Sequence, residues 1–510
     1  MRQLPADDET QLFGAPEGPL TRARALARSA ERAMLRASDA TQVHGNSARL
    51  LVDGPMTFDA WLAAAARAER YIHLENYIVR DDRTGRSFRD ALAEIARSGV
   101  AVRVLYDWLG CWATPVRFWR PLREAGAEVR AFAPPSFRDP FSFVRRDHRK
   151  VLVVDGEYAS VAGMCIGDEW AGNQAAGVPP WRDTAVEFRG PVAAVIDRAF
   201  ATTWAAAGTP LPLSEASPPD WIPAAGDVAV RVVEGEPGRS RIYRLAQFVA
   251  VGVERRLWIT DPYFVLPPAM TEALAAAARG GVDVRVIVPG YNNWPIVGGM
   301  SRAGYRPLLE AGVRLFEWEG PMIHAKTAVA DGIWSRVGSS NMNLASLLGN
   351  WELDVAILDR GFATEMERLF ERDLGRSAEV TLNRIMHPSG GYDRERRSME
   401  RRRRPRDLHP DLAEARRAQR RAYRGSGFGR WLSRISRVSS VLGRALLGRR
   451  IIGREDAGWI TLIGALLIAV AVIGLLVPRV LAWPLAFFLF WIGVASLFRA
   501  GERRTRGGGV

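Results

Sequence analysis

Two short stretches of the chain share one pattern: a histidine, a lysine two residues later, and an aspartate five residues after that lysine. The six residues are, in chain order, His148, Lys150, Asp155, His324, Lys326 and Asp331. A neutral imidazole can attack phosphorus, a protonated imidazole can donate to the leaving alkoxide, and two ammonium groups can hold the nonbridging oxygens. Because the chain of 510 residues has only 6 histidines, the two patterns together predict one phosphodiester-exchange site made from two halves.

A metal site is the alternative interpretation of the histidines. It is weakened because a lysine interrupts each cluster and no carboxylate-rich set of ligands accompanies it. We therefore expect neither a metal nor a cofactor. The aspartates belong to the candidate catalytic pattern, but each precedes a glycine at an expected hairpin turn. Their expected role is to stabilise the turn through hydrogen bonds from side chain to backbone.

The similarity of the two stretches extends beyond the motif. AGMC, ending at Cys165, aligns with GSSN, which contains Ser339 and ends at Asn341. An acid then follows in each copy, Asp183 in WRDTAVEF and Glu352 in NWELDVAI. Upstream, ERYIHLENYIV parallels ERRLWITDPYF, and GVAVRVLYD parallels GVDVRVIVP. Segments that recur in the same order indicate an internal duplication.

Each copy has a β/α pattern. Strands are expected over 71–79 and 257–264, and buried strands over 100–106 and 282–288. A helix capped by Ser87 is expected to end at Gly99, and another is expected over 270–279. The motif stretches predict a strand, an Asp-Gly turn and a second strand, with histidine and lysine on one strand face. The fold class is thus layered α/β, repeated twice.

Two uncharged runs, 459–477 and 480–498, stand near the end of the chain. Each is about long enough to cross a bilayer as a helix, since roughly 20 residues suffice. Arginines flank the pair on both sides, so the positive-inside rule places the duplicated body in the cytoplasm. A buried soluble hairpin is the alternative. Cys111 and Cys165 lie far apart and are expected to be ordinary buried thiols in a reducing compartment.

Much of the net charge of +14 comes from an arginine-rich stretch over 394–454. Such a stretch can be a solvated linker, a nucleic-acid arm or a segment held on anionic lipid. Its position directly before the apolar runs favours lipid. Apolar residues over 428–446 recur at helical spacing, which predicts an amphipathic helix that lies in the membrane interface or packs on the body.

These residues resemble the phospholipase D superfamily and, within it, the bacterial cardiolipin synthases, over about residues 40–382. The resemblance implies two α/β/α sandwich domains with one site at their interface and a phosphohistidine intermediate. It implies that His148 is the nucleophile and His324 the general acid, or the reverse, and that the lysines bind phosphate. Asp183 and Glu352 would orient the histidines, and the GSSN positions Ser339 and Asn341 would contact or orient the phosphate.

One departure from the family pattern stands in the first copy. Relatives often have Gly-Gly-x-Asn where this chain has residues 162–165, Ala-Gly-Met-Cys. An asymmetric pocket is the expected consequence. The position of the apolar hairpin at the far end of the chain also differs from the family's usual layout.

The predicted organisation can be given as a series of segments. They are 1–43, an arginine-rich segment compatible with a helix; 44–208, the first phospholipase D-like domain; 209–227, a Pro-rich linker; 228–385, the second such domain; 386–456, an Arg-rich linker with the amphipathic helix; 457–500, a transmembrane hairpin; and 501–510, a basic tail.

The predicted function is a phosphatidyltransferase anchored in the bacterial inner membrane that makes cardiolipin from two phosphatidylglycerol molecules. Anionic phospholipids are the expected partners, phosphatidylglycerol serving as donor and acceptor, and neither nucleic acid nor an obligate protein partner is expected. A hydrolase releasing phosphatidic acid is the first alternative. A phosphodiesterase or nuclease that uses the basic tail, and a noncatalytic membrane scaffold, are the others.

Overall fold

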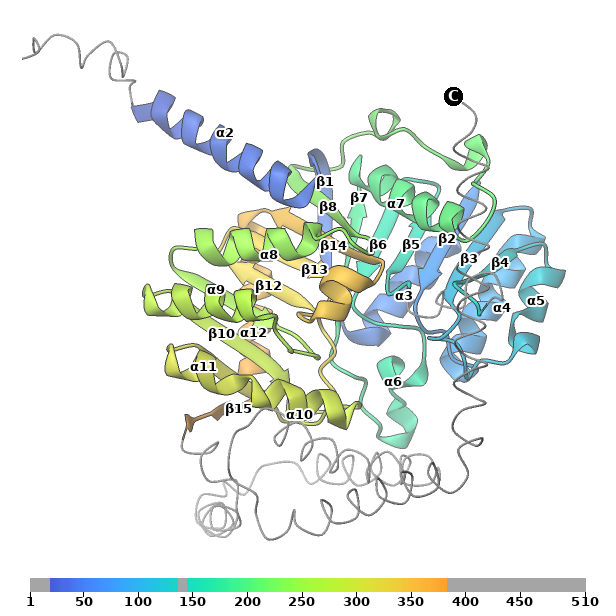
Figure 1. The fold of residues 1–510 in the computed structure, drawn as a ribbon. Helices are drawn as coiled ribbons and strands as arrows, with labels where there is room; N and C mark the ends of the chain where they lie inside the picture. Colours follow the sequence, from blue (N-terminus) through green and yellow to red (C-terminus); the bar gives the residue numbers. More distant parts are fainter. Residues whose placement is uncertain (1–18, 136–144, 383–510) are drawn as a thin grey trace, which may run out of the picture.

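The computed structural model describes residues 19–135 and 145–382, and their strands form one sheet of 15 strands. In sheet order, the first half contributes β1 (Gln42–Val52), β7 (Thr184–Arg189), β6 (Tyr158–Ala162), β5 (Lys150–Val154), β2 (Tyr71–Asn76), β3 (Ala101–Asp107) and β4 (Glu128–Phe132). The second half contributes β8 (Val228–Gly235), β14 (Glu352–Leu358), β13 (Trp334–Gly338), β12 (Thr327–Ala330), β9 (Arg256–Thr260), β10 (Asp283–Pro289), β11 (Arg314–Trp318) and β15 (Ser377–Val380). The halves meet where β1 pairs antiparallel with β8, so the expected duplication is present as one continuous sheet (Figure 1).

The two halves repeat the same strand arrangement outward from this junction. In each half, three parallel strands (β2, β3 and β4, or β9, β10 and β11) adjoin an antiparallel set that contains the motif hairpin. Strand β2 is buried along its whole length, as is usual for parallel strands covered on both faces. The carboxyl ends of the parallel strands therefore point to the same edge in each half.

Helices cover both faces of the sheet (Figure 1). In the first half they are α3 (Asp53–Ala65), α4 (Arg83–Arg97), α5 (Arg120–Glu124), α6 (Asp168–Ala171) and α7 (Val192–Ala206). In the second half they are α8 (Arg241–Gly252), α9 (Pro268–Arg279), α10 (Pro295–Ala303), α11 (Tyr305–Glu310) and α12 (Arg360–Leu374). Helix α2 (Pro19–Ser38) precedes both halves and packs on α8. Short one-turn helices lie at Val116–Trp119, Gln174–Ala176, Leu213–Glu215 and Pro219–Trp221, and a π-helical turn lies at Ala345–Gly349.

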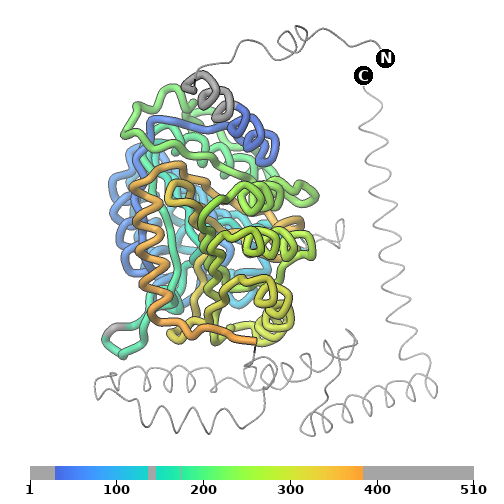
Figure 2. The backbone as a smooth tube through the Cα atoms, turned by 90° about the vertical axis from the view of Figure 1, so that its left-hand side faces the viewer, coloured from blue at the N-terminus to red at the C-terminus, as the bar shows by residue number. Residues whose placement is uncertain are grey.

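The halves share a hydrophobic core. One cluster of buried side chains combines Val151 and Val192 of the first half with Val230, Ile357 and Phe362 of the second. Helix α12, orange in Figure 2, packs on β1 of the first half as well as on β13 of its own half. Because apolar burial is continuous across the junction, the two halves form one structural unit.

Local boundaries differ in places from those expected. Helix α4 begins at Arg83, and its N-cap is Asp82, whose carboxylate accepts a hydrogen bond from the backbone N–H of Gly85. The expected cap, Ser87, is inside the helix, so that expectation was wrong. A cap needs a side-chain acceptor at the position where the backbone turns into the helix. The Pro-rich segment between the halves is also anchored, because buried Glu215 accepts hydrogen bonds from Arg103.

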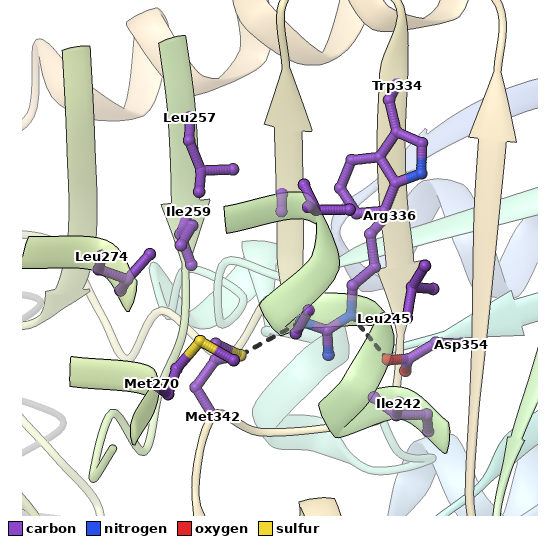
Figure 3. Close-up of a pocket in the computed structure, with 13 residues that line it drawn as sticks. Ile242, Leu245, Leu257, Ile259, Met270, Leu274, Trp334, Arg336, Met342 and Asp354 are labelled. Carbon is purple, nitrogen blue, oxygen red and sulfur yellow. Dashed lines mark hydrogen bonds and ion pairs between the residues drawn. The ribbon is translucent and has the colours of Figure 1, made fainter. Parts of the chain in front are cut away.

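A small apolar cavity lies in the core of the second half, between the sheet and helices α8 and α9 (Figure 3). Its lining includes Leu245, Met270 and Trp334. The ion pair of Arg336 and Asp354, 2.6 Å apart, closes one side. This pair also holds the loop after β13, since the Asp354 carboxylate accepts from the backbone N–H of Ser340. The cavity is thus part of the support behind the GSSN loop rather than an opening at the motif residues.

Among the described residues, no helix is both long and apolar enough to span a bilayer. The predicted hairpin (457–500), the Arg-rich segment with its amphipathic helix (386–456) and the basic tail (501–510) lie outside the described residues. Cys111 and Cys165 are both free and buried, as expected for ordinary core thiols.

Candidate active site

The two motif hairpins are formed as the sequence predicts. Strands β5 and β6 are joined by a turn at Asp155, and β12 and β13 by a turn at Asp331, and both aspartates have positive φ, 56° and 52°. The histidines differ slightly from expectation. His148 stands two residues before the start of β5, and His324 stands three before the start of β12, so each imidazole is carried by the segment entering the hairpin.

The carboxylates of the motif aspartates accept hydrogen bonds from the backbone. The Asp155 carboxylate accepts hydrogen bonds of 2.9, 2.9 and 2.8 Å from the backbone N–H groups of residues 69, 70 and 71. The Asp331 carboxylate accepts three of 2.9 Å from residues 254, 255 and 256. Each aspartate therefore ties its turn to the start of a neighbouring parallel strand, β2 or β9.

Each acid is hydrogen-bonded to the histidine of the opposite half. Nδ1 of His148 lies 3.0 Å from Oε2 of Glu352, and Nδ1 of His324 lies 2.7 Å from Oδ2 of Asp183. All four side chains are buried, the histidines at 8% and 5% exposure and the acids at 0%. A carboxylate on Nδ1 fixes the ring orientation and the tautomer that leaves Nε2 unprotonated. Both imidazoles are thus prepared to act through Nε2.

Backbone hydrogen bonds cross the junction beside the same residues. The N–H of His148 donates to the carbonyl of Trp351 at 2.8 Å, and the N–H of His324 donates to the carbonyl of Arg182 at 2.7 Å. The neighbours of the two acids therefore pair directly with the two histidines. Neither half could hold its own histidine in this way if separated from the other.

Arg149, between His148 and Lys150, gives the first motif a further connection to the second half. Its guanidinium is fully buried and donates to the carbonyl of Glu352 and to the Glu234 carboxylate, both at 3.1 Å. The second copy has Ala325 at this position. The connection is therefore a departure from the two-fold symmetry, and sequence comparison of the copies marks the position but not its partner.

The two lysines lie at the histidines. Nζ of Lys326 is 2.9 Å from Nε2 of His324 and 3.4 Å from the carbonyl oxygen of Gly163 in the other half. Nζ of Lys150 donates to the carbonyl of His148 and lies 5.1 Å from the ring centre of Tyr77. Both ammonium groups are almost completely buried. They form a positive, water-poor environment suited to an anionic phosphodiester.

Burial and the lysines set the protonation of this site. Burial lowers the pKa of His148, and burial together with the nearby Lys326 charge lowers the pKa of His324 to about 3. Burial also lowers the pKa of Lys326 to about 8. Although burial raises the pKa of Asp183, its interactions with His324 and Lys326 outweigh that effect and lower it. The same balance, with His148 and Lys150 as partners, lowers the pKa of Glu352.

The two acids are supported by different neighbours. Oε2 of Glu352 accepts from the hydroxyl of Ser339, and its Oε1 accepts from Asn350 at 3.2 Å. Oδ2 of Asp183 accepts instead from the indole N–H of Trp170 at 3.2 Å. Ser339 aligns with Gly163, where a Cβ would meet Oδ1 of Asp183 at 2.4 Å. Ser339 is therefore brought to the site as an orienting residue, and its counterpart must be a glycine.

The predicted asymmetry is visible at the next aligned pair, Asn341 and Cys165. Asn341 is buried, its amide nitrogen lies 3.4 Å from Ser346, and its Oδ1 makes no hydrogen bond within the described part of the chain. Cys165 is 1% exposed, and burial raises the pKa of its thiol. A neutral thiol is a weak hydrogen-bond donor, so the first half offers a weaker hydrogen-bonding group here than the second.

Aromatic residues around the histidines were missed by sequence reasoning. The ring of Tyr77 contacts His148 edge to face at 4.8 Å between centroids, and those of Trp170 and Tyr263 approach His324 at 5.6 and 5.9 Å. Both tyrosines follow the first parallel strand of their half, β2 or β9, one residue out of register in the repeated segments. That shared tyrosine was the available signal. Trp170, on the short helix α6, gave none.

Comparisons with known proteins agree with this geometry. A family model described as "Cardiolipin synthase, PLD-like domain" matches residues 62–169 and 252–374. The chain is 34% identical over 367 residues to cardiolipin synthase A of Pseudomonas putida, covering 72% of this chain and 76% of that protein. It is 33% identical over 361 residues to cardiolipin synthase A of Pseudomonas syringae, covering 70% and 75%.

A solved structure has the same fold. The phosphatidylserine synthase of Haemophilus influenzae superposes with a TM-score of 0.54 at 15% identity, covering 69% of this chain and 92% of that one. At this identity the likeness supports the architecture alone.

Proposed function

The chain belongs to the cardiolipin synthase family of phospholipase D-like proteins, and on that premise we propose that it is a phosphatidyltransferase that makes cardiolipin from two phosphatidylglycerol molecules. The two crossed acid and histidine pairs carry the proposal. They supply two oriented imidazoles beside two buried ammonium groups. This is the set of groups that two successive displacements at one phosphorus atom require.

In the first displacement, Nε2 of His148 attacks the phosphorus of one phosphatidylglycerol. The P–N bond forms and the bond from phosphorus to the glycerol oxygen breaks. His324, protonated in the substrate complex, gives its proton to that oxygen, and glycerol leaves. Lys150 and Lys326 hold the nonbridging oxygens, whose negative charge favours the protonated form of His324.

In the second displacement, the terminal hydroxyl of another phosphatidylglycerol enters. His324 now takes the hydroxyl proton, the oxygen attacks phosphorus, and the P–N bond breaks to restore neutral His148. Cardiolipin is released. Glu352 and Asp183 keep each ring on its Nδ1 side and stabilise the imidazolium as it forms, as a carboxylate does in other histidine-dependent enzymes.

The membrane placement is part of the proposal. The uncharged runs within 457–500 and the arginines on either side support an inner-membrane hairpin with the catalytic body on the cytoplasmic side. Donor and acceptor would then share a surface with the enzyme, which raises their effective concentration. Anionic phospholipids are the proposed partners.

Hydrolysis is the competing outcome, because water needs less space than a second lipid at the same phosphorus. The test is mass spectrometry of lipids after incubating the full chain with phosphatidylglycerol vesicles, beside His148→Ala and His324→Ala. We expect cardiolipin and glycerol in equal amounts, and neither product with either variant. Phosphatidic acid without cardiolipin would replace the transferase with a hydrolase, and turnover that survives both substitutions would remove the proposed site.

A further inference from the structure

Exposed apolar side chains are concentrated in three segments of the described chain. Eight of the fifteen large exposed apolar residues lie within 108–116, 290–300 and 343–348. They are Leu109, Trp112, Val116, Tyr291, Trp294, Met300, Leu344 and Leu348. Single exposed apolar residues are ordinary on a protein surface, but a local concentration marks an interaction site.

Two of these segments are equivalent in the duplication. The repeat that aligns GVAVRVLYD with GVDVRVIVP continues without a gap, so Leu109 aligns with Tyr291 and Trp112 aligns with Trp294. Trp112 is 66% exposed and Trp294 is 54% exposed. The segments follow β3 and β10 directly. Each half therefore presents an exposed tryptophan at the same place beyond its second parallel strand.

Both segments are fixed to the residues that surround the histidines. In the first half, the thiol of Cys111 donates a hydrogen bond to the carbonyl of Tyr77, whose ring contacts His148. Asp107, just before this segment, accepts a hydrogen bond of 2.9 Å from the backbone N–H of Asp147, the residue before His148. In the second half, the hydroxyl of Tyr263 donates to the side-chain carbonyl of Asn293 at 2.7 Å.

The third segment adjoins the second. The amide of Asn343 donates to the carbonyl of Tyr263 at 3.2 Å, and the next residue, Leu344, is 55% exposed. The three segments thus lie around the two histidines, one connected through Tyr77 and two through Tyr263. Within the described residues they form an apolar rim on the same side as the catalytic groups.

We propose that this apolar rim enters the headgroup region of a phospholipid bilayer and sets the opening of the active site against the lipid surface. Tryptophan and tyrosine favour this region because one end of each ring system is apolar and the other polar. The exposed Arg117, next to Val116, has no ion-pair partner among the described residues and adds attraction to anionic headgroups.

Burial of the histidines gives the rim its function. At 8% and 5% exposure they are reached only by a phosphodiester that enters the protein. A lipid that keeps its chains in the bilayer can supply that phosphodiester only if the opening lies at headgroup level. The inference rests on the proposed function for its substrate, but the contact with lipid can be measured without turnover.

The first test locates the rim relative to lipid. The full chain, labelled with a fluorophore at Trp294→Cys or at Val116→Cys, is reconstituted into phosphatidylglycerol vesicles containing a lipid with a nitroxide near the headgroup. The native thiols are buried and leave these positions as the labelling sites. Val251→Cys, 79% exposed just before β9 and so at the amino end of the parallel strands, is the matched control. We expect the nitroxide lipid to quench both rim labels and not the control.

If water or protein covers the apolar rim in place of lipid, the rim labels will show a different pattern of quenching. Quenching of the rim labels by aqueous iodide and not by the nitroxide lipid would overturn the proposal, because the rim would then face water. Protection from both quenchers would also overturn it, since the rim would be covered by another part of the chain or by a second copy.

The second test separates docking from chemistry. In Trp112→Ser/Trp294→Ser, we expect turnover of phosphatidylglycerol in vesicles to fall by at least about tenfold, which corresponds to roughly 1.4 kcal/mol of lost interfacial interaction. Turnover of dispersed short-chain phosphatidylglycerol should be retained, and Val251→Ser should change neither rate. Equal losses on both substrates would overturn the docking role. If wild-type protein turns over neither substrate while its rim labels are quenched, the proposed function fails and the docking surface stands.

Discussion

Asp183, in the first half of the chain, holds Nδ1 of His324 in the second half at 2.7 Å. The reciprocal pair, Glu352 and His148, is formed at 3.0 Å. The duplication therefore did not produce two independent sites. It produced one site in which each half completes the other, and a change to one half should impair the histidine of its neighbour.

Asp183→Asn tests this dependence. An asparagine side chain can turn its NH2 group toward Nδ1, which favours the tautomer with a proton on Nε2 and so impairs proton transfer at that nitrogen. We expect kcat to fall by about 10³ to 10⁴-fold with the fold intact. Asp220→Asn, at an exposed carboxylate in the linker, is the matched control. Retention of more than about a tenth of the wild-type rate would contradict the proposed role of the pair.

The pH profile of kcat/KM should lose activity on the alkaline side because Lys326 loses its charge. Burial lowers its pKa to about 8, so the ammonium is present below that pH and lost above it. In the resting site both histidines are held neutral, since burial lowers the pKa of each. The alkaline limb of the free enzyme is therefore assigned to the lysine, although two histidines alone also predict a bell-shaped profile.

Lys326→Arg provides the check on that assignment. A guanidinium stays protonated throughout the accessible range, so the alkaline limb should move upward by at least about one pH unit. The position of the limb is the readout even where the larger side chain lowers the rate. A limb that stays near pH 8 in the variant would assign it to another group.

Asp155 and Asp331 should contribute to stability and not to chemistry. Three backbone N–H groups donate hydrogen bonds to the Asp331 carboxylate. In Asp331→Asn, one of these N–H groups loses its acceptor and faces an NH2 group instead. We expect a loss of about 1 to 2 kcal/mol in the free energy of unfolding, measured in urea, with kcat of the folded protein unchanged. A large fall in kcat without loss of stability would restore the aspartate to the catalytic set.

The same substitution should change how stability depends on pH. Although burial raises the pKa of Asp331, its backbone hydrogen bonds lower it overall. A lowered pKa in the folded state means that the stabilisation is full above the unfolded value and is lost as pH falls through the folded value. Asp331→Asn should therefore remove part of the acid sensitivity of unfolding. Asp59→Asn, at an exposed position on α3, should leave it unchanged.

How far the sequence predicted this structure depends on whether a feature repeats along the chain. The motif hairpins, the parallel strands and helix α9 were predictable because their hydrophobic pattern and their Asp-Gly or Gly-Gly signals lie close together in the sequence. Helix α9 was predicted over 270–279 and is observed over Pro268–Arg279. The pairing of acids with histidines was not, because a duplication permits pairing within a half or across it. The backbone hydrogen bonds that cross between the halves, from His148 to Trp351 and from His324 to Arg182, decide for pairing across them.

Supporting residues were harder still to predict. Trp170 donates to Asp183 from a helix of four residues, and Arg149 reaches Glu234 across 85 positions of the chain. Tryptophan is commonly buried in a core and arginine is commonly exposed, so residue type alone did not mark either side chain as a support of the site. What the sequence did mark, without explaining it, was the difference between Gly163 and its aligned partner Ser339.

Gly163→Ala should disable the site through Asp183. An added Cβ would lie 2.4 Å from Oδ1 and 3.3 Å from Cγ of that carboxylate, so the carboxylate must move, and its bond to His324 with it. We expect a stability loss of about 1 to 3 kcal/mol from overpacking, and a fall in kcat beyond what partial unfolding explains. Gly252→Ala, where nothing lies within 4 Å of the added carbon, is the control.

Ser339 explains why the effect is specific to the first half. In the second half, the Ser339 side chain fits beside Glu352 and donates its hydroxyl hydrogen bond to that carboxylate. In the first half, Trp170 donates to the acid, and the carboxylate of Asp183 itself occupies the space beside Gly163. Normal activity in Gly163→Ala would mean that Asp183 can shift without releasing His324, and the glycine would then have no role in catalysis.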